Sequence, residues 1–273
     1  MQHKIIDSHI HFWDLANGCN DWIKGTDLPS LVEPTSLAID AFVHIEAHGD
    51  KRDSLCEYNW LKTNFPNKNI KVVAMADFTK DIQEFENDIL KFSNVHDIIG
   101  VRQIMSKTTN TNYSPFYKED IPKDLKEKLS ILKEYDLVFD AQMYPEQYLP
   151  LLDDIDSSSV TMMIEHFGLP IYAGNDNLNE WKALIKQLSQ NDNWFLKLSG
   201  FDLNNDIRNV SKCLDFVFDN ISTSKLCYGS NFPVSHQGNY NSWKDFLVEY
   251  IRDGNAIKDV CLNVANKIYL KGD

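Results

Sequence analysis

The chain contains 273 residues, of which 43% are hydrophobic and 25% are charged, and its formal net charge is -13 at pH 7. This composition excludes a largely disordered chain, while the length accommodates one large α/β domain or two smaller ones. The acidic balance argues against nucleic acid as a partner, because affinity for the phosphate backbone depends largely on Lys and Arg side chains.

Eight short segments rich in apolar residues are each long enough to form one β-strand. These segments span residues 4–12, 39–47, 70–78, 97–105, 137–144, 160–168, 194–201 and 225–234. Between them, apolar residues recur three and four positions apart, which is the period of an amphipathic helix. The clearest helical patterns span residues 82–93, 124–135, 178–190 and 211–221.

The alternation of strand and helix favours parallel strands joined by crossover helices. Two further helices, at 242–251 and 256–270, would close the fold, and no linker rich in Pro, Gly or Ser divides the chain. We therefore predict one domain over residues 1–273, an α/β fold of the (β/α)8 barrel (TIM barrel) type, with an open doubly wound sheet as the alternative. No GxGxxG or GxxxxGK[ST] motif follows a predicted strand, which counts against dinucleotide and P-loop nucleotide binding.

The cysteines are widely spaced and include no CxxC pair: Cys19, Cys56, Cys213, Cys227 and Cys261. This spacing argues against a disulfide framework or a zinc ribbon and predicts reduced thiols. The N-terminus lacks the features of a secretion signal, and no run of about 18 apolar residues indicates a membrane span. We expect a cytoplasmic protein without a membrane partner.

Two histidines lie one residue apart in the stretch "IIDSHIHFWD", at the end of the first predicted strand. Side chains alternate along a strand, so Asp7, His9 and His11 project from one face. Active sites of (β/α)8 barrels lie at the C-terminal ends of the strands, which is where these histidines fall. Neutral imidazoles at this spacing can share one divalent ion, with a carboxylate in support. The alternative is a pair of structural histidines held by hydrogen bonds.

Other predicted strands also end in polar side chains. Gln142 ends the fifth strand, His166 ends the sixth, and Asn231 lies at the end of the eighth. In a barrel these three residues would converge with His9 and His11 on one rim. The sequence therefore predicts a catalytic site formed by His9, His11, His166 and Asn231.

Glu46 and Arg102 lie at the ends of the second and fourth predicted strands. A guanidinium in an apolar barrel mouth requires acceptors, which are either Glu46 or an anionic group of the substrate. Together with Gln142, these two residues are predicted to bind the substrate. On the second strand, His44 is predicted to be packed, and His48 is predicted to be an exposed loop residue.

A set of motifs follows in fixed order along nearly the whole chain: "IDSHIHFWD", "HIEA", "EYNWL", "IIGVRQ", "FDAQMYP", "MIEHFGLP", "LKLSG", "YGSNFPV" and "NVANKIYL". This ordered set resembles the amidohydrolase superfamily, and within it the amidohydrolase-related group that contains fuconolactonase, rhamnonolactonase and pyrone dicarboxylate lactonase. The resemblance implies a distorted (β/α)8 barrel of the metal-dependent hydrolase type, which opens a lactone ring by attack of water.

The resemblance also implies roles for individual residues. His9, His11 and His166 match histidines that either hold one divalent metal ion, with zinc as the expected ion, or hydrogen-bond the lactone carbonyl without metal. Arg102 matches a residue that meets the carboxylate or hydroxyl groups of the substrate. Many other amidohydrolases carry a metal ligand at the position of Gln142, so this site is expected to hold one metal ion or none.

One position departs from the family pattern. The family reads Gly-Ser-Asp-Trp-Pro where this chain reads "GSNFP", so Asn231 replaces the carboxylate expected to act as general base and sometimes as metal ligand. An amide takes no proton from water and neutralises no charge on a metal ion. Asp7, Glu46, His166 and His236 are the other candidates for the base.

Three functions follow from these observations. The first is hydrolysis of a lactone of a sugar acid or a related carboxylate, with a small molecule as the partner. The second is a binding protein that keeps the pocket without turnover, which Asn231 supports. The third is a decarboxylase, because relatives of this barrel remove carboxylates from aromatic acids. The sequence leaves the oligomeric state open, a homodimer included.

Overall fold

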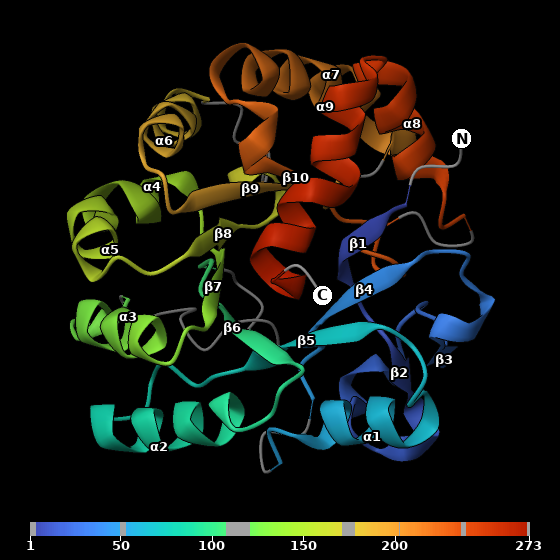
Figure 1. The fold of residues 1–273 in the computed structure, drawn as a ribbon, viewed down its shortest axis with the longest axis vertical. Helices are drawn as coiled ribbons and strands as arrows, with labels where there is room; N and C mark the ends of the chain where they lie inside the picture. Colours follow the sequence, from blue (N-terminus) through green and yellow to red (C-terminus); the bar gives the residue numbers. More distant parts are fainter. Residues whose placement is uncertain are drawn as a thin grey trace.

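The computed structural model describes residues 4–49, 53–107, 121–170, 178–201, 203–235 and 239–271. Its main element is an eight-stranded sheet in the order β1-β4-β5-β6-β7-β8-β9-β10, with every neighbouring pair parallel (Figure 1). The strands are β1 (Ile6–Ile10), β4 (Ala41–Ile45), β5 (Ile70–Met75), β6 (Ile98–Ile104), β7 (Val138–Gln142), β8 (Met162–Ile164), β9 (Trp194–Leu198) and β10 (Leu226–Tyr228). Each lies within one of the segments predicted from the sequence, so the predicted strands are confirmed.

The sheet closes on itself where β1 meets the segment that follows β10. The backbone N–H of His11 donates to the carbonyl of Phe232 at 2.9 Å, and that of Asn231 donates to the carbonyl of His9 at 2.7 Å. The (β/α)8 barrel is therefore confirmed. The doubly wound alternative is wrong, because an open sheet would keep its two edge strands apart.

Helices surround the barrel in Figure 1. They are α1 (Cys56–Asn64), α2 (Ile82–Ser93), α3 (Leu125–Glu134), α4 (Pro145–Tyr148), α5 (Leu152–Ser158), α6 (Asn179–Gln190), α7 (Leu203–Asn220), α8 (Ser242–Ile251) and α9 (Gly254–Lys258). The chain continues from α9 through π-helical turns at Asp259–Asn263 and Asn266–Leu270, and two short strands, β2 (Trp13–Asp14) and β3 (Leu31–Val32), pair after β1. Among the described residues, no helix has the length and apolar character that crossing a bilayer requires.

Helix α2 shows how the sequence pattern produces these helices. Asp81 caps its N-terminus by accepting a hydrogen bond from the backbone N–H of Glu84 at 2.9 Å. Phe85, Ile89 and Phe92 are spaced four and three residues apart, and all three are buried against the barrel. The apolar stripe read from the sequence is therefore the face that packs.

The barrel interior has an apolar end and a polar end. Near the start of β7, Val138 packs against the C-terminal segment of the chain, and Phe195 near the start of β9 does the same. Two residues further along each strand, on the same face, come Asp140 and Lys197, both completely buried. The polar end leads to the C-terminal rim of the strands, where active sites of this fold lie.

Two of the cysteines form a disulfide, so the prediction of reduced thiols is wrong for them. Cys19, in the segment after β1, is bonded to Cys56 at the start of α1, 37 residues away. Cys213, Cys227 and Cys261 are free and buried. Sequence spacing gave no sign of the pair, because the two thiols meet only when the segment after β1 folds against α1.

Candidate active site

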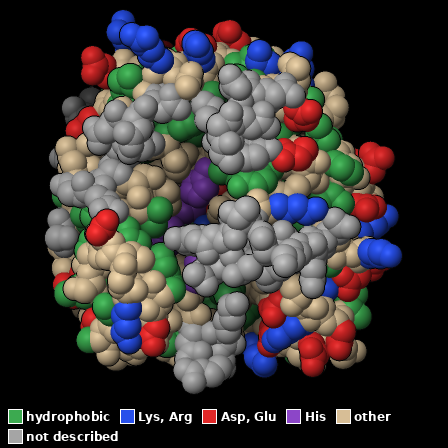
Figure 2. All heavy atoms as spheres, turned by 180° about the vertical axis from the view of Figure 1, so that it is seen from behind, with side chains coloured by type: hydrophobic (Ala, Val, Ile, Leu, Met, Phe, Trp, Pro, Cys, Tyr) green, Lys and Arg blue, Asp and Glu red, His purple; other side chains and the backbone are tan. Residues whose placement is uncertain are grey.

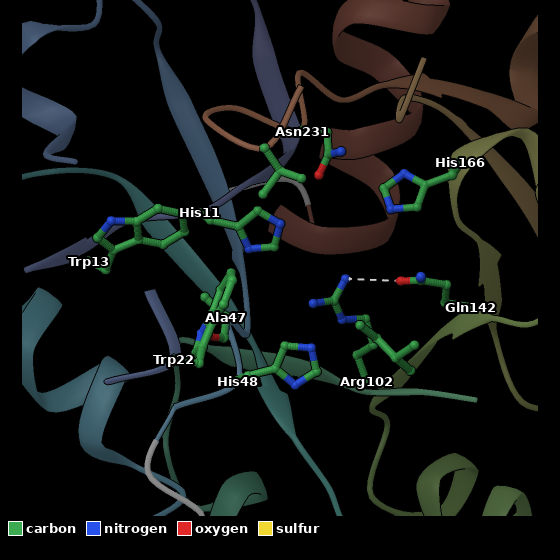
Figure 3. A pocket seen from close by; sticks show the side chains of 11 residues that line it. His11, Trp13, Trp22, Ala47, His48, Arg102, Gln142, His166 and Asn231 are labelled. Atoms are coloured by element: carbon green, nitrogen blue, oxygen red, sulfur yellow. Dashed lines mark hydrogen bonds between the residues drawn. The ribbon is translucent and has the colours of Figure 1, made fainter. Parts of the chain in front are cut away.

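A cavity of about 170 Å³ opens at the C-terminal ends of the barrel strands, where Figure 2 shows histidine side chains in a hollow of the surface. Its lining includes several residues predicted from the sequence: His11, Arg102, Gln142, His166 and Asn231. Figure 3 shows their side chains converging from different strands of the barrel. His9 and Glu46, also predicted, do not line the cavity and are completely buried.

The rest of the wall was not predicted, and it consists of Trp13, Trp22, Ala47, His48, Ile104 and Val234. The indole N–H of Trp13 donates to the carbonyl of Pro29 at 2.8 Å, and that of Trp22 donates to the carbonyl of Ala47 at 2.6 Å. Both rings therefore offer mainly carbon surface to the cavity. The prediction that His48 is an exposed loop residue is wrong, because it is half-buried in this wall, with its ring centroid 6.0 Å from that of Trp22.

Two of the histidines that line the cavity are held at Nδ1. His11 Nδ1 lies 2.8 Å from the carbonyl oxygen of Ile45, which only accepts hydrogen bonds, so His11 carries its proton on Nδ1 when neutral. His166 Nδ1 lies 2.9 Å from the hydroxyl of Ser199. In His11, Nε2 is therefore an unprotonated acceptor.

His9 lies next to both of these rings, with centroid distances of 5.1 Å to His11 and 4.6 Å to His166. Its Nδ1 lies 3.2 Å from a carboxylate oxygen of Glu165, which favours a proton on Nδ1. Its Nε2 is buried and has no hydrogen-bond partner among the residues that the structure describes. A buried polar atom without a partner is costly, so this nitrogen points to a missing ligand or ion.

Glu165, which the sequence analysis did not single out, lies at the centre of the buried charges. Its carboxylate is 3.0 Å from Nη1 of Arg102 and 3.8 Å from Nζ of Lys197, in addition to its contact with His9. Burial alone would raise the pKa of Glu165, but Arg102 and His9 hold it well below its usual value. The signal in the sequence is a charged residue that directly precedes His166 in an apolar run.

Arg102 is already paired within the protein. Its Nε donates to the carboxylate of Glu46 at 2.8 Å, and Nη2 donates to the backbone carbonyl of Glu46 at 2.5 Å. Nη1 donates to Glu165 at 3.0 Å and to Gln142 at 3.5 Å, the second bond being the dashed line in Figure 3. Burial opposes the charge of Arg102, yet the two carboxylates raise its pKa above the usual value, so the guanidinium stays charged.

Asn231 directs its side-chain oxygen toward the middle of the cavity in Figure 3. Its Nδ2 donates to the hydroxyl of Ser235 at 2.9 Å, which leaves Oδ1 as the acceptor on the cavity side. Its φ of 52° lies in the left-handed region, which asparagine tolerates better than most residues. The residue can therefore orient a water molecule, but it cannot take a proton from one.

The backbone at the end of β8 is also left-handed, with φ of 52° at His166 and 58° at Phe167. Such conformations are uncommon outside glycine and concentrate at functional sites. Two glycines make room for the histidines: a Cβ at Gly200 would lie 2.5 Å from Nδ1 of His166, and one at Gly229 would lie 2.6 Å from Cβ of His9. The motifs "LKLSG" and "YGSN" thus fix the positions of two imidazoles.

His9, His11 and His166 are neutral near pH 7. Burial lowers the pKa of His166 to about 4, with Arg102 acting in the same direction and Glu165 against it. Burial also holds the pKa values of His9 and His11 well below 6.5. Neutral imidazoles can bind a metal ion or accept a proton, and both properties suit a hydrolytic site.

The two carboxylates considered as general bases, Asp7 and Glu46, already accept hydrogen bonds from other groups of the protein. Asp7 accepts hydrogen bonds from the backbone N–H of Ser230 at 2.9 Å and the hydroxyl of Tyr240 at 2.8 Å, and burial raises its pKa to about 6. Glu46 is bonded to the guanidinium described above. Neither carboxylate lines the cavity. His236 lies outside the described residues.

His9, Glu165 and His166 form a group whose ligand atoms all lie within 4.8 Å of one another, which suits one divalent ion. Histidine ligands usually have their second ring nitrogen held by another group, as Nδ1 of His166 is here. The buried Nε2 of His9, which lacks a partner among the described residues, supports the same conclusion. His11, predicted as the third histidine ligand, is not in this group, and its role as a ligand stays a prediction.

The amidohydrolase family model matches residues 6–269, and the chain belongs to this family. Two relatives are each 24% identical to it. The uncharacterized protein y4mH of Sinorhizobium fredii aligns over 282 residues, which cover 90% of this chain and 92% of the relative. The L-fucono-1,5-lactonase of Burkholderia ambifaria aligns over 260 residues, which cover 87% and 84%.

Solved structures with low sequence identity share the fold. An amidohydrolase from Burkholderia multivorans with bound zinc has a TM-score of 0.75 at 19% identity, covering 98% of this chain and 99% of that chain. The probable 2-pyrone-4,6-dicarboxylic acid hydrolase from Acinetobacter baumannii, with citric acid bound, has a TM-score of 0.72 at 15% identity, covering 97% and 99%. The 2,6-dihydroxybenzoate decarboxylase from Rhizobium has a TM-score of 0.63 at 10% identity, covering 100% of both chains.

Proposed function

We propose that this amidohydrolase opens a lactone, a cyclic ester of a small sugar acid or related carboxylate, by attack of water. The observation that carries the proposal is the convergence of His11, His166 and Asn231 on one cavity, with His9 buried beside them. Two of the similar proteins, named as an L-fucono-1,5-lactonase and a probable 2-pyrone-4,6-dicarboxylic acid hydrolase, support this reaction class.

In this proposal, Asn231 and His11 act on the water molecule. Asn231 Oδ1 accepts one of its hydrogens, while Nε2 of His11 accepts the proton released as the water oxygen bonds to the carbonyl carbon. The bond between that carbon and the ring oxygen then breaks, and the ring oxygen takes the proton from His11. The product is an open-chain hydroxy acid, so water and lactone are fully accounted for.

His9, Glu165 and His166 are the residues that would hold a divalent ion, and zinc suits this set of imidazole and carboxylate ligands. The ion would supply Lewis-acid polarisation of the lactone carbonyl. Proton transfer and orientation of the water stay with His11 and Asn231 in either case. Polarisation of the carbonyl and activation of the water therefore depend on different residues.

A binding protein without turnover is the second candidate, and one observation favours it. Asn231 stands where the family carries a carboxylate, and the loss of a positioned base typically lowers the rate by about 10² to 10⁴. His11 supplies an acceptor in this chain, but its low pKa makes it a weak base. Such a protein would bind the same lactones and release them unchanged.

The test uses protein purified without chelator and without a histidine tag. Its metal content is measured first, and a panel of uncharged and carboxylated lactones is then incubated with it in H₂¹⁸O. Hydrolysis predicts one ¹⁸O atom in the carboxylate of the hydroxy acid. Ligand binding without ¹⁸O incorporation would favour the binding protein, and release of CO₂ from 2,6-dihydroxybenzoate would favour a decarboxylase.

A further inference from the structure

We propose that Glu57 is the positioning residue of the cavity wall, and that its buried carboxylate holds Ala47 and Trp22 where they contact the substrate. Glu57 begins the motif "EYNWL" on helix α1, and it does not line the cavity itself. This inference rests on the proposed function for its effect on kinetics. Its structural part, the position of the wall, can be tested without a substrate.

Three donors from different parts of the described chain converge on the Glu57 carboxylate. Nδ2 of Asn20 donates to Oε1 at 2.6 Å, and the backbone N–H of Ala47 donates to Oε1 at 3.0 Å and to Oε2 at 3.2 Å. The third donor is Nε2 of His44, which lies 3.4 Å from Oε2. Asn20, His44 and Glu57 are all buried, so these hydrogen bonds form where water competes little for them.

The direction of the His44 hydrogen bond follows from the other nitrogen of the ring. Nδ1 of His44 lies 3.1 Å from the backbone N–H of Phe12, which can only donate, so Nδ1 accepts and Nε2 carries the proton. Phe12 lies between His11 and Trp13, which both line the cavity. A chain of hydrogen bonds therefore connects Glu57 to this part of the wall as well.

Ala47 is the residue at which these hydrogen bonds reach the cavity. Its N–H is bound to Glu57, while its carbonyl accepts hydrogen bonds from Nδ2 of Asn20 at 2.9 Å and from the indole N–H of Trp22 at 2.6 Å. Ala47 and Trp22 both line the cavity, and Figure 3 shows them on the same side of it. The position of the indole therefore depends on a residue whose backbone Glu57 holds.

The turn that carries Trp22 is short, and its residue Asn20 is used for this connection. Asparagine at the position before a helical turn often caps the turn through its side chain. The side chain of Asn20 does not cap the turn Asp21–Ile23, because it donates to Glu57 and Ala47. The disulfide Cys19–Cys56 joins the same two segments, and Glu57 adds the end of β4 to them.

Gly49 makes room for the carboxylate. A Cβ at this position would lie 3.0 Å from Cγ and Cδ of Glu57 and 3.1 Å from its Oε1. Carbon atoms that are not bonded to each other pack at about 3.5–4.0 Å, so a methyl group here would displace the carboxylate from Ala47. His44 and Ala47 belong to the motif "HIEA", so this network gives "HIEA" and "EYNWL" a common role.

Glu57→Gln tests the carboxylate at constant size. An amide offers one oxygen and one N–H₂ group, so in either orientation its nitrogen faces another donor. We expect KM for the lactone to rise about 10-fold or more, which corresponds to the loss of a hydrogen bond to a charged group, while kcat falls less than about threefold. The effect on kcat is smaller because His11 keeps its own hydrogen bond to Ile45 at 2.8 Å.

Ile89→Ala is the control for a general loss of stability. The substitution removes a buried side chain from helix α2, outside the barrel. It should lower the melting temperature because it leaves a cavity in the packing, and it should leave KM unchanged. Thermal melting of both variants shows whether the losses of stability are comparable.

Gly49→Ala is a second variant, which keeps the carboxylate but displaces it. KM should rise in this variant too. In a Glu57→Ala background, Gly49→Ala should change KM by less than about twofold, because the atoms that the new methyl group would meet are gone. Full additivity of the two substitutions would contradict an action of Gly49 through Glu57.

A spectroscopic measurement without substrate tests the wall itself. The chain contains six tryptophans, so labelling with 5-fluorotryptophan gives six ¹⁹F resonances, and a Trp-to-Phe substitution assigns each one. Glu57→Gln should shift or broaden the resonance of Trp22. The resonances of Trp181 and Trp194, which are buried in the core, should stay unchanged.

The possible results separate this inference from the proposed function. If no lactone is hydrolysed, the proposed function fails, and the Trp22 resonance decides the inference by itself. An unchanged Trp22 resonance in Glu57→Gln would overturn the inference whatever the kinetics. In an active enzyme, an unchanged KM would also overturn it, and so would an equal rise of KM in Ile89→Ala, because loss of stability would then explain the effect.

Discussion

Two groups of buried charged residues lie at successive levels inside the barrel, and they differ in how completely their polar atoms are used. In the lower group, Lys197 forms an ion pair with Asp140, and the hydroxyl of Tyr269 donates to the second carboxylate oxygen at 2.7 Å. In the upper group, Glu165 forms an ion pair with Arg102, yet Nε2 of the adjacent His9 has no hydrogen-bond partner among the described residues. The charged groups of the lower group are paired with each other, whereas the upper group has an unpaired polar atom beside the cavity.

The difference shows why the same residue types have different roles. Buried charges are tolerated when each is paired and hydrogen-bonded, and a closed network of this kind holds neighbouring strands together. A buried atom that lacks a partner costs free energy of folding and persists where a ligand supplies the missing contact. The predictions that follow test this division between a structural level and a functional level.

The largest effect is expected at the cavity. His11→Gln removes the proton acceptor of the proposed mechanism, so kcat for lactone hydrolysis should fall by about 10² to 10⁴. Stability should change less, because the variant loses one hydrogen bond, between Nδ1 and Ile45, and the ring contacts with His9, Trp13 and His44. Steady-state kinetics and thermal melting measure the two quantities. His96→Gln, at an exposed histidine on another face, is the control and should retain full activity.

Substitutions in the lower group, which contains Lys197 and Asp140, are expected to change stability. Lys197→Met leaves the carboxylate of Asp140 buried without its cation, which typically destabilises a protein by about 3–5 kcal/mol. Urea unfolding should show this loss. Lys197→Met combined with Asp140→Leu removes both charges and should recover much of it. A double variant as unstable as the single one would mean that the pair is not the cause.

The sequence predicted the fold and several residues of the rim, because both follow from local patterns. The alternation of apolar strands with amphipathic helices specified the barrel, and the ends of the strands gave His166, Gln142 and Asn231. Glu165 was missed because one carboxylate beside a histidine has no pattern of its own. Its role depends on Arg102, which comes from a different strand.

The cavity wall and the disulfide were also missed, for a related reason. Trp22 belongs to a short 3₁₀ turn, Asp21–Ile23, in a segment whose path over the rim no periodicity describes. Cys19 and Cys56 are brought together by that same path. Their separation of 37 residues carries no information about contact. Local patterns therefore predict elements and strand ends, whereas contacts between loops require the folded chain.

The disulfide gives the third prediction, because it connects the segment that carries Trp22 to helix α1. Cys56→Ser should lower the free energy of unfolding by about 2–4 kcal/mol, the usual contribution of such a cross-link. KM should rise more than kcat falls, since the wall is loosened while His11 keeps its place. A variant with unchanged stability would show that the thiols are not bonded in solution.

Asn231→Asp is expected to have a smaller effect, in the favourable direction. The change returns an ionisable oxygen to the cavity at nearly constant size, so divalent-metal affinity should rise and hydrolysis should accelerate by about 10- to 100-fold. Asn231→Ala is the control and should lower both. If the wild-type protein is already fast and the aspartate variant is no faster, His11 suffices as the base and the binding-protein alternative falls.

The smallest expected effect is that of mild acid on activity. Burial lowers the pKa of His166 to about 4 and holds that of His11 well below 6.5, so both imidazoles stay neutral in mild acid. Between pH 8 and about 5.5, kcat/KM should therefore change less than about twofold, and it should fall only as the pH approaches the lowered values. A decline centred near pH 6.5 would show that an ordinary histidine controls the reaction.

The same shifts fix the sign of the effect on stability. His166 has its folded pKa, about 4, below its unfolded value of 6.5, so in that range the unfolded chain binds more protons and stability falls as the pH falls. Asp7 acts in the opposite direction, because its folded pKa of about 6 exceeds its unfolded value of 3.8, and its protonation stabilises the fold as the pH falls through this range. Urea unfolding at several pH values should therefore show a weaker acid dependence for the wild-type protein than for an Asp7→Asn variant. In that variant the contribution of His166 is no longer offset, and an unchanged slope would contradict the raised pKa of Asp7.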